Sequence, residues 1–202
     1  MNDQNFELKK LASDSQAIFD LIEPRSKVLD LGCGDGELLY HLIQKKNCHA
    51  SGIEIDEHSI YQCIEKGITV SHADINEELA HYPDKRFDYV ILNESLQQVV
   101  NAERVITEAL RIGKQIIVGV PNFCFLPARF QIFFGGSVPK TKCLPYEWYN
   151  TPNVRFFSLK DFRSFCKKKN IRIKNFIGIG NTKRVSIFPN LFAILGIFLL
   201  EG

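Results

Sequence analysis

The residues whose types and spacing could carry chemistry stand close together near the start of the chain, in the segment VLDLGCGDG at 28–36. Gly32, Gly34 and Gly36 alternate there with other residues, and glycines let backbone N–H groups approach a ligand closely. The acidic Asp30 stands just before the first of these glycines. The segment is typical of a strand, a tight turn and a helix N-terminus that together bind a small molecule.

Two ligand classes compete for a turn of this kind. A dinucleotide site prefers G-x-G-x-x-G, because its helix N-terminus must face a pyrophosphate. The glycines here are spaced more tightly, and the carboxylates of Asp30 and Asp35 would repel a pyrophosphate but attract a cation. S-adenosylmethionine carries two cations, its sulfonium and its amino group. We therefore predict S-adenosylmethionine as the cofactor, bound at Asp30, Gly32, Cys33, Gly34 and Gly36.

Acidic residues also follow the next two predicted strands. Glu54 stands at a strand end, where a carboxylate can accept hydrogen bonds from both ribose hydroxyls of the cofactor. Asp74 could accept the adenine amino group while Ile75 packs on the ring, and Ile55 beside Glu54 joins the predicted site. An aspartate in a turn can instead cap a helix, and for Asp74 this alternative stays open.

The segment NESLQQ at 93–98 follows the fourth predicted strand, at the edge where open α/β sheets bind ligands. It lacks the Asn/Asp-Pro-Pro-Tyr signature of methylases that act on the amino groups of adenine or glutamine, so that class is disfavoured. Asn93 is predicted to contact the cofactor through its backbone. No catalytic residue is identified, and the candidates for contact with a methyl acceptor are Asn93, Glu94, Tyr146 and Tyr149.

Strands and helices alternate along the chain in an order that would bring these residues together. Short apolar runs predict strands at 27–31, 48–55, 68–71, 87–92, 115–120, 171–179 and 193–200. Apolar residues at helical spacing predict helices at 6–22, 36–46, 57–66 and 102–111. Asp56 is a predicted N-cap, and Ser158 with Asp161 predicts a capping box that begins a further helix.

This alternation predicts an α/β fold with a seven-stranded, mostly parallel, Rossmann-like sheet, helices on both faces and an antiparallel last strand. That arrangement matches the class I methyltransferase fold. We expect one domain over residues 1–202, since no linker or repeat divides the chain. The less regular section 121–157 follows the fifth strand and is expected to cover the cofactor cleft.

Composition disfavours several other functions. A formal net charge of +2 is too small to indicate a nucleic-acid partner. The six cysteines form no Cys-x-x-Cys pair and follow a polar N-terminus, so we expect reduced thiols, no metal site and a cytoplasmic protein. The apolar run 191–200 is too short to span a bilayer. Segment 123–134 could lie on a membrane surface, but packing onto the domain or a partner protein is favoured.

A closer resemblance covers nearly the whole chain. The stretches VLDLGCGDGELL, GIEID, FDYVIL, SLQQV, VPNF, LPYEWYNTPNVRFFSLKDF and IFLL resemble the methionine-biosynthesis protein family MetW, within the class I S-adenosylmethionine-dependent methyltransferases. The part LPYEWYNTPN at 144–153 is the most specific, because general methyltransferases do not carry it. The resemblance implies a role in methionine synthesis beside a homoserine O-acyltransferase. It implies no particular methyl acceptor.

Two functions of different classes follow from these observations. The chain could be a methyltransferase that acts on a small molecule, leaves S-adenosylhomocysteine as product and works without that partner. It could also be a regulatory module that holds S-adenosylmethionine and contacts the acyltransferase. Both require cofactor binding, and the lack of a clear catalytic base is compatible with either.

Overall fold

Strand β1 (Lys27–Leu31), which leads into the glycine turn, is buried at four of its five residues and lies inside a single sheet. The computed structural model describes residues 11–181 and 183–202. The other strands are β2 (His49–Glu54), β3 (Thr69–His72), β4 (Phe87–Asn93), β5 (Gly113–Pro121), β6 (Arg172–Ile179), β7 (Arg184–Val185) and β8 (Leu195–Glu201).

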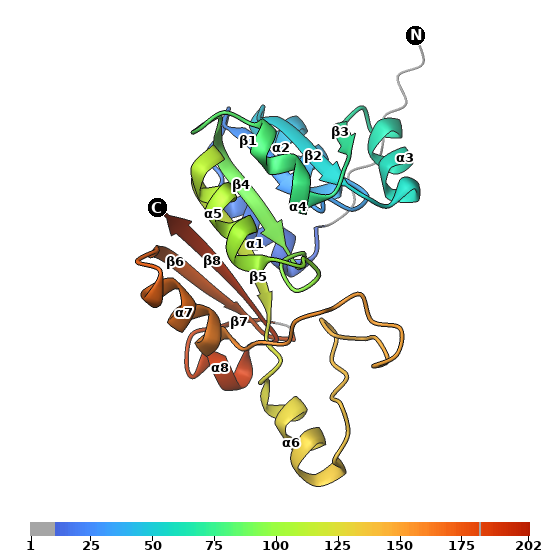
Figure 1. Ribbon diagram of the computed structural model, residues 1–202, viewed down its shortest axis with the longest axis vertical. Helices are drawn as coiled ribbons and strands as arrows, with labels where there is room; N and C mark the ends of the chain where they lie inside the picture. Colours follow the sequence, from blue (N-terminus) through green and yellow to red (C-terminus); the bar gives the residue numbers. More distant parts are fainter. Residues whose placement is uncertain (1–10, 182) are drawn as a thin grey trace.

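Helices connect and cover these strands (Figure 1). They are α1 (Ser13–Leu21), α2 (Glu37–Lys46), α3 (Glu57–Glu65), α4 (Ile75–Glu78), the 3-10 turn η1 (Leu79–His81), α5 (Ala102–Ile112), α6 (Leu126–Gly135), α7 (Leu159–Lys168) and α8 (Pro189–Phe192). The predicted helix at 6–22 corresponds to α1, and its positions 6–10 lie outside the described residues. Segment 126–135 forms α6 within the section that was predicted to be less regular.

The sheet has the order β3-β2-β1-β4-β5-β8-β6-β7. Neighbours from β3 to β5 are parallel, whereas β8 is antiparallel to both β5 and β6. The prediction of a mostly parallel α/β sheet with helices on both faces and an antiparallel last strand is confirmed. The prediction of seven strands was wrong by one, because the two-residue β7 pairs with the end of β6 and is too short to show a period-2 pattern.

Alternate residues of the central strands feed two cores, one on each face of the sheet. In β4, Val90 and Leu92 belong to the cluster that includes residues of α5 and α7. Their neighbours Tyr89 and Ile91 belong to the cluster that includes residues of α1, α2 and α3. Both faces of β4 are therefore covered, which is why its sequence FDYVIL reads as a continuous apolar run.

Polar side chains mark the helix starts that the sequence predicts. Asp56 accepts a hydrogen bond from the Ser59 backbone N–H at 2.8 Å and caps α3. Ser158 and Asp161 form a reciprocal capping box at the start of α7. These caps satisfy N–H groups that have no partner within their own helix, so each fixes where its helix begins.

Candidate functional site

A cleft of about 350 Å³ opens beyond the carboxyl ends of β1, β2 and β4. Parallel strands end at the same edge of a sheet, so the loops that follow them meet there. The lining comes from the glycine turn, the end of β2, the loop into α4 and the loop after β4: Gly32, Gly34, Glu54, Ile55, Ala73, Asp74, Ile75, Asn76, Asn93, Glu94, Ser95, Gln98, Val99 and Val100. Seven of the ten residues predicted to bind the cofactor are among them.

The glycine turn has a backbone that only glycine adopts without strain. Gly32, Gly34 and Gly36 have φ angles of +80°, +54° and +74°. A Cβ on Gly32 would come within 3.1 Å of the Ser95 Cβ, whereas the space around Gly34 is open. The backbone of the turn is therefore exposed toward the cleft at Gly34, as close approach of a ligand requires.

The Glu54 carboxylate is held in place by three backbone N–H groups. Its Oε2 accepts from Gly34 N at 2.8 Å, and its Oε1 accepts from Ile55 N at 2.8 Å and Asp56 N at 3.0 Å. A carboxylate has about four acceptor positions, so Oε2 keeps one for a ligand. The Gly34–Glu54 bond joins the turn after β1 to the end of β2 and orients the carboxylate.

The loop after β3 places Asp74 and Ile75 in the lining of the cleft, next to the end of β2. Asp74 Oδ1 accepts hydrogen bonds from Asn76 N at 2.8 Å and from Asn76 Nδ2 at 2.7 Å, and Asp74 is the N-cap of α4. The alternative role of Asp74 as a helix cap is therefore confirmed. This role leaves Oδ2 of the same carboxylate for a ligand, and contact with adenine stays a prediction.

Three predicted cofactor residues, Asp30, Cys33 and Gly36, are absent from the lining of the cleft. Asp30 is buried, and burial, followed by the nearby Glu54 and Cys63, raises the pKa of its carboxyl well above the usual range. Cys33 packs against Cys63, with the two Sγ atoms 3.9 Å apart. A Cβ on Gly36 would meet Ile68 and Cys63, so this glycine serves packing as well as the turn. Their part in cofactor binding stays a prediction.

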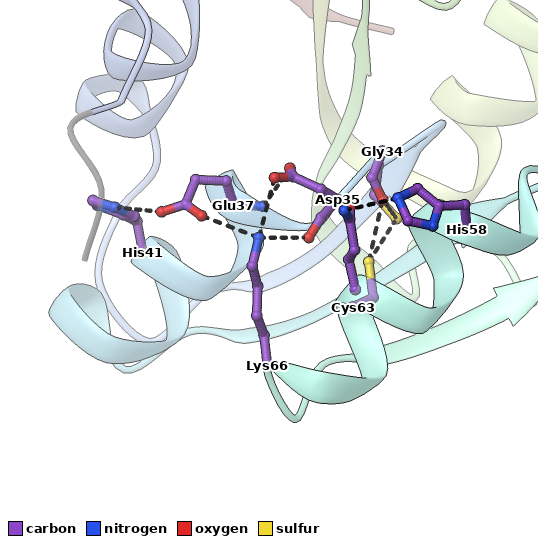
Figure 2. A network of polar contacts seen from close by, with 9 residues as sticks. Gly34, Asp35, Glu37, His41, His58, Cys63 and Lys66 are labelled. Atoms are coloured by element: carbon purple, nitrogen blue, oxygen red, sulfur yellow. Dashed lines mark hydrogen bonds and ion pairs between the residues drawn. The ribbon is translucent and has the colours of Figure 1, made fainter. Parts of the chain in front are cut away.

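A lysine holds the second half of the turn (Figure 2). Lys66, which follows α3, donates from Nζ to the Asp35 backbone oxygen at 2.8 Å and pairs with the Asp35 and Glu37 carboxylates at 3.2 and 3.0 Å. Glu37 also faces His41 at 3.2 Å. The charge of Asp35 is thus balanced by Lys66, and the acidic character of the cleft rests on Glu54, Asp74 and Glu94 instead.

The end of β4 brings one further carboxylate, that of Glu94, to the cleft. Asn93 Nδ2 donates to Asp14 Oδ2 of α1 at 2.8 Å. Glu94 has a φ of +54°, an uncommon backbone for a residue with a side chain. Burial and the Asp14 carboxylate raise the pKa of Glu94 to about 7. Among the described residues, the side-chain oxygens Asn93 Oδ1 and Ser95 Oγ are buried without a hydrogen-bond partner.

The acceptor candidates separate in space. Asn93 and Glu94 line the cleft, whereas Tyr146 and Tyr149 are 47% and 68% exposed and are absent from its lining. Sequence reasoning missed Asp14, since nothing in the pattern of α1 marks one polar residue as different from the others. It also missed Ser95, Gln98, Val99 and Val100, although the polar run after the fourth strand was a usable signal.

We expect Glu94→Gln to change how stability depends on pH. The folded protein holds the Glu94 proton more tightly than the unfolded chain does, so the wild-type free energy of unfolding should fall as pH rises from 4.5 toward about 7. Gln cannot ionise, so the variant does not lose this stability as the pH rises. Between pH 4 and a pH above 7, the free energy of unfolding of the variant should therefore rise relative to that of the wild type by on the order of 2 kcal/mol.

Urea unfolding at pH 4, 6 and 8 measures this difference. Glu65→Gln, at an exposed position at the end of α3, is the matched control and should follow the wild type. A Glu94→Gln curve parallel to that of the wild type at all three pH values would contradict the assignment.

Section 121–157 lies beside the loop after β4. Val154 N and Arg155 N donate to Gln97 O at 3.0 and 3.1 Å. Helix α6 extends away from the sheet (Figure 1). The lining of the cleft comes from residues between 32 and 100. That the section covers the cleft stays a prediction.

The polar and apolar groups that line the cleft fit the expected cofactor. It offers carboxylates at Glu54, Asp74 and Glu94 for hydroxyl, amino and sulfonium groups, together with the open backbone at Gly34. Ile55 and Ile75 add apolar walls for an aromatic ring. In residues 11–181 and 183–202, no group of His, Cys, Asp and Glu could hold a metal ion, and no helix is long and apolar enough to cross a membrane.

Comparisons with solved structures agree with this fold. Two S-adenosylmethionine-dependent methyltransferases, from Thermotoga maritima and Archaeoglobus fulgidus, match with a TM-score of 0.65 each. They are 20% and 17% identical, over 94% and 93% of this chain and 87% and 90% of their own. At such identities the likeness shows the fold, which is that of the class I methyltransferases.

Sequence comparisons identify the family. The family model for the methionine biosynthesis protein MetW matches residues 12–200. The bifunctional methionine biosynthesis protein MetXA/MetW of Rhodopirellula baltica is 34% identical over 79% of this chain, which spans only 27% of that relative's length. The ubiquinone biosynthesis O-methyltransferase of Dechloromonas aromatica is 26% identical, over 92% of this chain and 84% of its own. With a family match from residue 12 to residue 200, the chain belongs to the MetW family of methionine biosynthesis proteins.

Proposed function

We propose that this chain binds S-adenosylmethionine in the cleft and acts in methionine biosynthesis together with a homoserine O-acyltransferase. The observation that carries the cofactor assignment is the Gly34 N–H held 2.8 Å from the Glu54 carboxylate at the mouth of the cleft. This bond places the open backbone of the turn beside an oriented carboxylate. A nucleoside with an attached amino acid needs the carboxylate to accept its ribose hydroxyls and the open backbone to lie close to the turn.

Each wall of the cleft has a role in this proposal. Glu54 accepts the ribose hydroxyls, and charge-assisted bonds of this kind are worth roughly 1.5–3 kcal/mol each. Asp74 and Ile75 receive the adenine. Asn93 and Glu94 lie at the end of β4, where they face the amino-acid part of the ligand. The carboxylates favour a positively charged ligand over an anionic dinucleotide.

Methyl transfer to a small molecule is the second candidate function, and Glu94 is the observation that favours it. When bound, S-adenosylmethionine supplies an electrophilic methyl group. A pKa of about 7 lets the Glu94 carboxylate accept a proton from an amine or hydroxyl near neutral pH. The substitution Glu94→Gln would then abolish turnover while leaving cofactor affinity within a few-fold of the wild type.

The partner assignment rests on the fused relative and on an exposed apolar surface. In Rhodopirellula baltica, one chain carries the names MetXA and MetW together. Here, α6 exposes Phe133 and Phe134 at 81% and 74%, and Trp148 is 73% exposed. The only charged residue of α6, Arg129, donates from Nε to Cys124 O at 2.6 Å, so α6 has no charged face of the kind that binds a membrane surface. We therefore place the acyltransferase contact on α6 and Trp148.

Replacing both Phe133 and Phe134 by serine tests this contact. The double variant should bind the purified homoserine O-acyltransferase of the same organism at least about tenfold more weakly, as expected for aromatic anchors of an interface. Its affinity for S-adenosylmethionine should not change. The matched control replaces Tyr61 and Ile64, which are 65% and 59% exposed on α3, by serine. Equal binding by both double variants would count against α6.

The acyltransferase assay decides between the two functions. If the chain is a regulatory module, the rate of acyl transfer in the reconstituted pair should depend on the chain and on S-adenosylmethionine. If it is a methyltransferase independent of the partner, labelled methyl should reach an acceptor in cell extract while the acyl-transfer rate stays constant. We place both activities in the cytoplasm, where the cysteines of the described chain remain free thiols.

A further inference from the structure

Two cysteines meet directly beneath the glycine turn. Cys33 belongs to the turn and Cys63 to α3, and their Sγ atoms are 3.9 Å apart in a buried site. The Cys63 thiol also donates to the backbone oxygen of Gly34 at 3.2 Å, and Figure 2 shows Cys63 pointing to that residue. The pair is therefore linked through Gly34 to the Glu54 carboxylate that the cleft presents.

Two glycines leave the space that the sulfur atoms occupy. A Cβ on Gly52 of β2 would lie 2.3 Å from Cys33 Sγ, and a Cβ on Gly36 would lie 2.8 Å from Cys63 Sγ. Real atoms do not approach so closely, so any side chain at either position would displace a thiol. The packing thus holds both sulfur atoms close to one another and to the turn.

The two thiols differ in acidity. The hydrogen bond with Cys33 lowers the pKa of Cys63, and the Lys66 ammonium contributes in the same direction. The same bond and burial raise the pKa of Cys33. Cys63 is therefore the sulfur that ionises first, and a thiolate is the form that reacts with oxidants.

We propose that Cys33 and Cys63 form a reversible disulfide on oxidation by hydrogen peroxide, and that this bond deforms the glycine turn and weakens binding in the cleft. The effect on binding rests on the proposed cofactor site, whereas the bond and the deformation do not. A small oxidant is needed, because Cys33 is 9% exposed and Cys63 is fully buried.

The reaction balances in two steps. The Cys63 thiolate attacks one peroxide oxygen, forms a sulfenic acid and releases hydroxide, which takes up the thiol proton to become water. The Cys33 sulfur then attacks the Cys63 sulfur, and the departing hydroxyl leaves with the Cys33 proton as a second water. Each sulfur loses one electron, and the peroxide gains two. A dithiol such as dithiothreitol returns both thiols by exchange.

Bond formation must bring together a sulfur atom of the turn and a sulfur atom of α3. A disulfide has an S–S length of about 2.05 Å, so the sulfur atoms must close nearly half of their 3.9 Å separation. The Cys63 hydrogen bond to Gly34 O is lost at the same time, because the sulfur no longer carries a proton. The lost hydrogen bond acts on Gly34, whose N–H orients Glu54, and the new bond acts on Cys33, the residue before it.

Peptide mapping and hydrogen exchange test the bond without any cofactor. After peroxide treatment, mass spectrometry should find Cys33 joined to Cys63, and amide exchange over 32–36 should become faster, with both changes reversed by dithiothreitol. Cys63→Ser and Cys63→Ala should show neither change. Both variants are made, so that the test still stands if one of them fails to fold. Cys166→Ala removes a buried thiol of α7 and should respond as the wild type does.

Two results would overturn the proposal: persistent thiol labelling of Cys33 and Cys63 after peroxide, or a bond that leaves the exchange of 32–36 unchanged. Calorimetry then measures affinity for S-adenosylmethionine, which should be about five- to tenfold weaker in the oxidised protein than in the reduced protein. Equal affinities would overturn the coupling to the cleft. Lack of binding by the reduced protein would instead count against the proposed function alone, since the mapping and exchange results do not depend on it.

Discussion

Replacing Glu54 by alanine is expected to weaken binding of S-adenosylmethionine by about a hundredfold, which corresponds to about 3 kcal/mol. The substitution removes the acceptor for the ribose hydroxyls. It also releases the Gly34 N–H, which Glu54 Oε2 holds at 2.8 Å, so the turn loses its connection to β2. Isothermal titration calorimetry on the two proteins measures the difference directly.

The conservative variant Glu54→Gln separates shape from charge. The amide oxygen of the new glutamine side chain can still accept from Gly34 N but carries no charge, so the affinity of this variant should lie between those of the wild type and Glu54→Ala.

Gly34→Val should also bind S-adenosylmethionine weakly, because a φ of +54° strains any residue with a Cβ. Glu65→Ala, at an exposed position beyond the cleft, is the control. Unchanged affinity in both Glu54→Ala and Gly34→Val would remove the basis of the proposed function.

Replacing Phe198 by alanine is expected to lower the free energy of unfolding by about 3–5 kcal/mol. Phe198 lies fully buried in β8, with its ring centroid 4.8 Å from those of both Phe162 in α7 and Phe176 in β6. The strand that carries it pairs with β5 on one side and β6 on the other. A cavity at this point would loosen the contact between the parallel and antiparallel parts of the sheet.

Urea unfolding followed by circular dichroism measures this loss. Phe133→Ala is the matched control, because it removes the same ring from a position that is 81% exposed, and it should change stability by less than about 0.5 kcal/mol. Similar losses in the two variants would mean that the ring of Phe198 does not contribute as a core residue.

Sequence reasoning was successful where a local pattern decides the structure. The strands that precede the glycine turn and Glu54 follow from apolar runs, and the caps at Asp56 and Ser158 follow from residue type and spacing. The α/β fold follows from the alternation of strands and helices, since parallel strands need crossovers. The family follows from motifs spread over nearly the whole chain, which the match to residues 12–200 confirms.

Short or irregular elements were harder to predict. The strand β7 has two residues, and only its hydrogen bonds to β6 define it. Helix α6 is apolar on several sides, with Phe133 and Phe134 exposed, so the amphipathic period that marks a surface helix is weak. The sequence of a short segment cannot identify a strand or helix that is defined by its contacts with other segments rather than by its own periodicity.

By itself, the sequence determined the order of strands and helices along the chain, the backbone freedom of the glycine turn, the position of Glu54 at a strand end and that of Asp74 in the turn after the next strand. Only the tertiary structure decided that Asp30, Cys33 and Gly36 do not line the cleft and that Asp14 reaches the end of β4. It also decided that Lys66 balances the charge of Asp35. The physical reason is that a residue's charge and reactivity depend on burial and on neighbours distant in the chain, and these are set only when the two cores pack against the sheet.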